Sequence, residues 1–122
     1  MTTTISGSNG IVFPDATSMQ TGQQAVKAWV NFNGTGAVAI RAGYNVSSIT
    51  DVSTGNYQIN FTNAFADANY SAVAMNRADT DYGPLVGQPH NYATQSTTSI
   101  YLKCGSYGAL ADSSVVSVAI FR

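Results

Sequence analysis

Apolar and polar residues alternate with a period of two in several short stretches of this chain. The clearest stretch is 56–62, where Tyr57, Ile59 and Phe61 alternate with Gln58, Asn60 and Thr62. Successive side chains of a β-strand point to opposite faces of a sheet, so this period predicts strands with one buried face. The same pattern recurs in residues 26–32 and 98–104, residues 70–77 are predicted to form another strand, and residues 115–121 form a dense run rich in β-branched residues.

Turn-forming residues separate these stretches. Asn33-Gly34-Thr35-Gly36 and Thr54-Gly55 are strong turn signals, residues 67–69 form a third, and Gly43 marks an expected kink. Only 9% of the residues are charged, against about 25% in an average domain, and none is Glu, which favours helices. We therefore predict an all-β chain, an antiparallel β-sandwich of about 6–8 strands.

The first residues differ from the rest. Residues 1–24 are rich in Thr, Ser, Gly and Gln around a short apolar patch that includes Phe13. We predict an extended arm or linker over 1–24, with Phe13 docking on a neighbour, and one sandwich domain over 25–122.

The charge pattern narrows the choice of partners. The five basic residues are scattered, and the net charge is -1, so neither nucleic acid nor an anionic membrane surface is an expected partner. No apolar run is long enough to span a bilayer, and Met1 to Gly10 lacks the apolar segment of a signal peptide. The single cysteine, Cys104, lies in an apolar alternation and is expected to be a buried thiol.

Trp29 is the most informative single residue. It alternates with Val30 and Phe32, so it is expected to lie on the outer face of its strand. A large aromatic residue in that position is typical of an interface. We predict that Trp29 and Phe13 contribute to a subunit interface or to packing of the arm. Ligand stacking is the alternative for Trp29.

Residues 78–97 contain no recognisable strand pattern, and a connection of this length is usually functional. Aromatic rings can stack on sugar faces, while carboxylates and amides can bond sugar hydroxyls. The predicted receptor-binding residues are Asp79, Asp81, Tyr82, His90, Asn91 and Tyr92, with Tyr107 from a second Gly-rich loop over 105–113. The alternative is an ordinary polar loop with incidental aromatic residues.

Asp79 and Asp81 also raise two chemical alternatives. Alternate oxygen ligands suit calcium, but the remaining ligands of the familiar loop are missing, and one histidine cannot build a multi-histidine zinc site. A pair of carboxylates can hydrolyse glycosidic bonds, but a general acid needs a buried site that a Gly/Pro-rich loop does not indicate. We therefore expect no metal, no cofactor and no enzymatic activity.

One resemblance extends over residues 11–77. The runs Trp29-Val30-Asn31-Phe32-Asn33-Gly34-Thr35-Gly36, Tyr44-Asn45-Val46-Ser47-Ser48-Ile49-Thr50-Asp51 and Thr54-Gly55-Asn56-Tyr57-Gln58-Ile59-Asn60-Phe61-Thr62 resemble the C-terminal, distal module of bacteriophage tail-fibre proteins. Ile11-Val12-Phe13-Pro14-Asp15 resembles the junction that precedes such tips, with Ala16 where that junction usually has Gly.

This resemblance implies a homotrimeric tip domain in the virion. Such a domain would continue from the fibre shaft at residues 1–24 and would bind a host cell-surface receptor, a glycan or a protein. It would be made in the host cytoplasm and would act outside the cell after lysis. The alternatives are a purely structural module that trimerises or caps a fibre and, further off, a polysaccharide-degrading enzyme.

Overall fold

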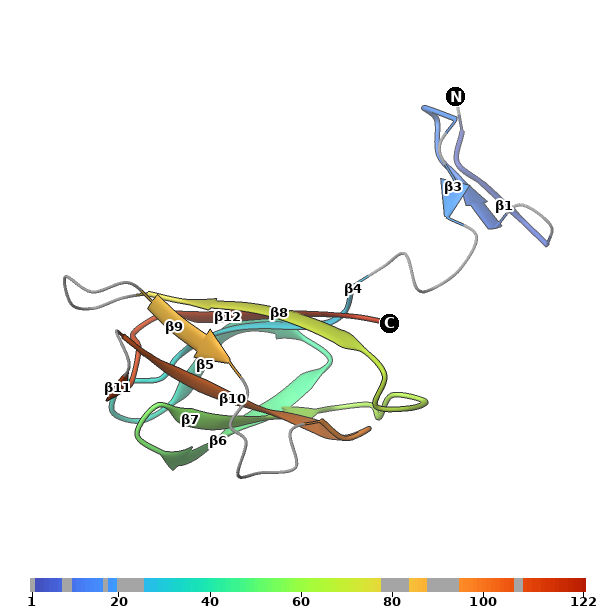
Figure 1. Ribbon diagram of the computed structural model, residues 1–122. Coiled ribbons are helices and arrows are strands. Elements are labelled where there is room, and N and C mark those ends of the chain that lie inside the picture. Colours follow the sequence, from blue (N-terminus) through green and yellow to red (C-terminus); the bar gives the residue numbers. More distant parts are fainter. Residues whose placement is uncertain are drawn as a thin grey trace.

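A computed structural model describes residues 2–7, 10–16, 18–19, 26–77, 84–87, 95–106 and 109–122. Within these ranges the chain is all-β, with twelve strands and no helix, and every strand pairing is antiparallel (Figure 1). The predicted all-β class is confirmed, and the antiparallel sheets are consistent with the predicted β-sandwich, although the strands outnumber the expected 6–8. The trimer stays a prediction.

The N-terminal residues form a small sheet of their own. Its strands are β1 (Thr4–Ser6), β2 (Gly10–Val12) and β3 (Ser18–Met19), in that order. Between β2 and β3, the Ala16 amide donates to the Phe13 carbonyl oxygen over 3.0 Å, and Ala16 has a φ of 67°. This left-handed conformation favours Gly. The extended arm predicted over 1–24 stays a prediction.

The remaining strands form two sheets that lie in two layers (Figure 1). The four-stranded sheet has the order β5-β4-β12-β8, and its strands are β4 (Val26–Asn33), β5 (Ala39–Tyr44), β8 (Ser71–Asn76) and β12 (Val116–Phe121). The five-stranded sheet has the order β11-β10-β7-β6, with β9 also paired to β10. Its strands are β6 (Val46–Ser53), β7 (Asn56–Phe61), β9 (Pro84–Gly87), β10 (Ser99–Ser106) and β11 (Ala109–Leu110).

The hydrophobic core fills the space between the two sheets, an arrangement consistent with a β-sandwich. Its side chains come from the inner faces of β4 and β12 on one side and of β7 and β10 on the other. Phe32 and Tyr57 meet across the layers edge to face, with ring centroids 5.2 Å apart. The predicted inward positions Ile59 and Phe61 are buried, and so is Cys104.

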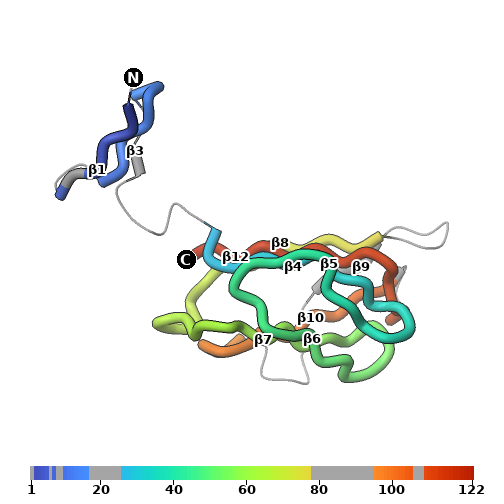
Figure 2. The backbone as a smooth tube through the Cα atoms, turned by 180° about the vertical axis from the view of Figure 1, so that it is seen from behind, coloured from blue at the N-terminus to red at the C-terminus, as the bar shows by residue number. Residues whose placement is uncertain are grey.

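The chain changes sheets at Asn45, between β5 and β6 (Figure 2). Asn45 has a φ of 55°, and its side-chain amide donates to the carbonyl oxygens of Lys27 and Asn63. Its Oδ1 accepts the Asn63 amide over 2.8 Å. The expected kink at Gly43 was therefore misplaced by two residues, because Gly43 lies within β5 and pairs with Val30.

Three further expectations need correction. The β4–β12 register shifts between Ile120 and Phe121, so Val26 leaves the inner alternation and is 38% exposed. Residues 78–97 are not a continuous loop, since they contain β9, in which Val86 pairs with Cys104. The Gly-rich stretch 105–113 likewise contains the end of β10 and all of β11. Both missed strands are too short to display a clear alternation.

Candidate functional site

The predicted receptor-binding residues lie outside the described parts of the chain. They are Asp79, Asp81, Tyr82, His90, Asn91, Tyr92 and Tyr107. Their role in binding therefore stays a prediction, and the candidate surface developed below comes from other residues.

Trp29 lies on the outer side of β4 and is 40% exposed, which confirms its predicted orientation. It pairs with Tyr44 of β5 and with Ala119 of β12, and Ala119 pairs with Val73 of β8. Paired residues of neighbouring strands point to the same side of a sheet. An apolar row therefore crosses all four strands on the outer surface of this sheet. We call this outer surface the groove face. Its flanking residues Tyr44 and Val73 are 59% and 58% exposed.

A groove runs along β12 on this face, with a volume of about 480 Å³. The small side chains of Ser117 and Ala119 form its floor, because β12 lies between two strands with larger outward residues. Trp29 stands on the β4 side, while Val73 and Met75 stand on the β8 side, and Met75 is 68% exposed.

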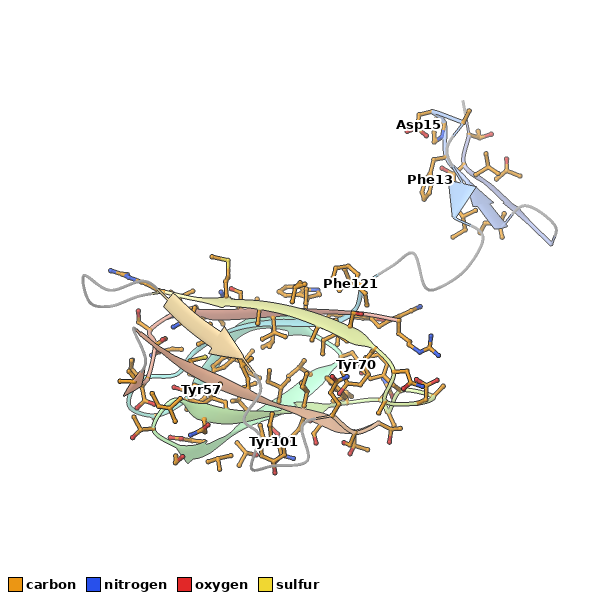
Figure 3. The ribbon with its side chains drawn as sticks, viewed as in Figure 1. Phe13, Asp15, Tyr57, Tyr70, Tyr101 and Phe121 are labelled. Atoms are coloured by element: carbon orange, nitrogen blue, oxygen red, sulfur yellow. The ribbon has the colours of Figure 1, made fainter. Side chains whose placement is uncertain are left out.

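Phe121 continues the outward series of β12 beyond Ala119 and is also exposed. Figure 3 shows Phe121 on the side of the four-stranded sheet that faces away from the core. Large apolar side chains thus lie along both walls of the groove and at the end of β12. A face of this composition is typical of a surface that another molecule covers.

Polar groups on the groove face are already hydrogen-bonded. Asn31 donates to the Ser117 hydroxyl over 2.9 Å, and Arg41 donates to the Ser114 carbonyl oxygen over 2.6 Å. The described residues that line the groove carry no charge. A partner can therefore cover the groove without stripping water from an unpaired ion, which is the costly step in burying charge.

Sequence reasoning missed Tyr44, Val73 and Met75 as members of this surface. In β8 the larger residues Val73 and Met75 alternate with Ala72 and Ala74, and a reading by hydrophobicity places large apolar residues inside. In β8 the usual arrangement is reversed, because the small residues take the inner positions and the large ones point outward.

A second group of polar side chains is buried and has a structural role. The Tyr57 hydroxyl lies 2.9 Å from Asp112 Oδ1 and 3.0 Å from the Gly34 carbonyl oxygen, and the Gly55 amide donates to the same Asp112 oxygen over 2.8 Å. Burial, with the hydrogen bond to Asp112, raises the pKa of Tyr57 well above its usual value. These contacts tie two turns to residues 109–114.

Cys104 matches its prediction as a buried thiol. Burial, and next the negative charge of Asp112, raises its pKa to about 12, so the thiol is neutral near pH 7. Asn76 is buried nearby and donates to the Gly105 carbonyl oxygen and the Ser113 hydroxyl, while its Oδ1 accepts no hydrogen bond from the described residues. Neither residue is exposed to a substrate, so neither is assigned chemistry.

A metal-binding arrangement is not found in the described ranges, which contain no group of three or more His, Cys, Asp or Glu side chains. The same ranges hold no helix long and apolar enough to cross a membrane. Comparison with known proteins gives no match to a protein-family model, to a curated protein or to a solved structure.

Proposed function

We propose that this chain is a distal adhesion module of a phage tail fibre, which assembles as a homotrimer through the groove face and binds a host cell-surface receptor. The observation that carries the assembly part is the exposed apolar row around Trp29, with its groove along β12. The adhesion part rests on the resemblance of residues 11–77 to tail-fibre tips.

Energetics favour covering this face. Burying a large apolar side chain completely contributes about 1.5–3 kcal/mol. Trp29, Val73 and Met75 are exposed, so much of this stabilisation is still to be gained when a partner covers them. A second copy offers the same uncharged groove, and the net charge of -1 per chain adds little repulsion. Closed symmetry would then bury the face on every copy.

A purely structural role is the second candidate, because the groove face favours assembly whether or not the module also binds a receptor. In that case the trimer would register or cap a fibre shaft. We do not propose catalysis. Under the adhesion proposal the protein is part of the virion, is made in the host cytoplasm and acts outside the cell.

The test is the native mass in solution, measured by light scattering on a sizing column. We expect three times the chain mass of 12.8 kDa for the unaltered protein. Met75→Lys places a charge on the wall of the groove and should shift the mass to one chain. Thr50→Lys, on the outer side of the other sheet, is the matched control and should leave the trimer intact.

A folded, unaltered protein with the mass of one chain would overturn the assembly proposal. A dimer that Met75→Lys dissociates would reject the trimer but keep the groove face as the interface.

A further inference from the structure

The outer face of β6, β7 and β10 is mostly polar, in contrast to the groove face on the other layer. Strand pairing places its side chains in three rows, each with one residue from β6, β7 and β10. We call these nine residues the polar lattice: Ser48–Asn60–Ser99, Thr50–Gln58–Tyr101 and Ser53–Asn56–Lys103.

Hydrogen bonds within the lattice have a consistent direction. The Asn60 side-chain amide donates to the hydroxyls of Ser48 and Thr50, over 3.1 and 3.0 Å. The Gln58 amide donates to the Ser99 hydroxyl over 3.1 Å. In each case the amide nitrogen of the central strand is held by a hydroxyl of a neighbouring strand.

This direction leaves a defined set of polar atoms for a ligand. The amide oxygens of Gln58 and Asn60 accept no bond from the described residues, so they remain acceptors. The hydroxyls of Ser48 and Thr50, which accept from Asn60, keep their own hydrogens as donors. Donors and acceptors therefore lie close together on a surface whose amide side chains are already held in place.

Tyr101 supplies the one aromatic ring of the lattice. It lies beside Gln58 on β10, is partly exposed, and is seen in Figure 3 on the side of its sheet away from the core. An aromatic ring beside fixed hydrogen-bonding groups suits a ligand with both an apolar face and hydroxyls. Lys103, in the adjacent row, is the only cation of the lattice.

We propose that the polar lattice is a glycan-binding surface, on which a sugar ring stacks on Tyr101 and its hydroxyls bond Gln58, Asn60 and Thr50. The inference rests on the proposed adhesion function and assigns its receptor site to residues outside the predicted loop. Sugar hydroxyls both donate and accept, which matches the mixed groups of the lattice. Uncharged groups also lose less on desolvation than ions do.

The position of the lattice fits the proposed assembly. It lies on the outer face of one layer, while the groove face lies on the outer face of the other (Figure 1). Copies that associate through their groove faces leave their lattices uncovered. Three weak sites on one rigid particle would then gain affinity from one another.

The test uses the full chain on a printed array of neutral and uronic-acid-containing bacterial polysaccharides, followed by an NMR titration with an oligosaccharide of the best polymer. We expect shifts of amide signals in β6, β7 and β10. Tyr101→Ala should weaken oligosaccharide binding about tenfold, whereas Tyr101→Phe keeps the ring and should bind nearly normally. Gln58→Ala and Asn60→Ala leave the Tyr101 ring in place and should still weaken binding, because they remove hydrogen bonds to the sugar.

Several outcomes would overturn the proposal that the polar lattice binds a glycan. One is binding that survives Tyr101→Ala, Gln58→Ala and Asn60→Ala, and another is a titration that shifts only signals from residues 78–97. A trimer that binds no polysaccharide would reject the glycan site but keep the assembly part of the proposed function. Met75→Lys separates the two parts, since it should lower array binding through lost valency and leave the oligosaccharide affinity unchanged.

Discussion

At the scale of single residues, buried ionisable groups make the stability depend on pH. Cys104, Tyr57 and Tyr70 are all buried in the core. Burial is the largest cause of the raised pKa in each, and the pKa of Tyr70 rises to about 12. A buried group of this kind stays protonated in the folded protein while it ionises in the unfolded chain. The folded state is therefore penalised at alkaline pH.

Cys104 should lower the stability between pH 9 and 12. Its pKa rises from a usual 9.0 to about 12, so above pH 9 the unfolded chain holds fewer protons than the folded protein. The free energy of unfolding then falls as pH rises, by up to about 1.4 kcal/mol per pH unit. Urea unfolding at pH 8 and pH 10 should show a fall that is roughly 1 kcal/mol larger than in Cys104→Ala. Equal falls in the two proteins would contradict the assigned burial of the thiol.

At the scale of strands, the step from β5 to β6 decides how the layers connect. Asn45 occupies a left-handed conformation and bonds the backbone of Lys27 and Asn63. It thus joins the start of β4, the change of sheet and the end of β7 in one residue. Gly adopts this left-handed conformation without strain, but it has no side chain to make the hydrogen bonds of Asn45.

Substitutions of Asn45 should separate these two contributions. Asn45→Gly keeps the conformation and loses the side-chain bonds, which should cost about 1 kcal/mol of unfolding free energy. Asn45→Ala also adds left-handed strain of about 1–2 kcal/mol and should be the less stable variant. Urea unfolding at neutral pH compares the two. An alanine variant at least as stable as the glycine variant would refute the strain at this position.

At the scale of the whole molecule, the two outer faces differ in character. The groove is lined by uncharged, mostly apolar residues, while the polar lattice consists of amides and hydroxyls with one aromatic ring and one cation. One face favours association with a surface of its own kind, and the other favours a hydrated ligand. The proposed trimer uses both without competition, because they belong to opposite layers.

Assembly should make thermal stability depend on protein concentration. A partner that binds only the folded chain raises the unfolding temperature by mass action. We expect the Tm from calorimetry to rise between dilute and concentrated solutions of the unaltered protein. Met75→Lys should abolish this dependence, whereas Thr50→Lys should preserve it. A Tm that is independent of concentration would argue against a trimer held by the groove face.

The sequence by itself determined the fold class and most of the core. Alternation is a local property, so the strands around Ile59, Leu102 and Val118 and the burial of Cys104 followed from neighbouring residues alone. The outward position of Trp29 followed in the same way. A single strand is enough to display a period of two.

Only the tertiary structure decided where strands pair and which outward residues meet. The exposure of Val26 depends on a register shift against β12, and the change of sheet at Asn45 depends on both layers. The groove face exists because small residues of β12 lie between larger residues of β4 and β8, which are distant in sequence. Register is a relation between strands, so no pattern within one strand contains it.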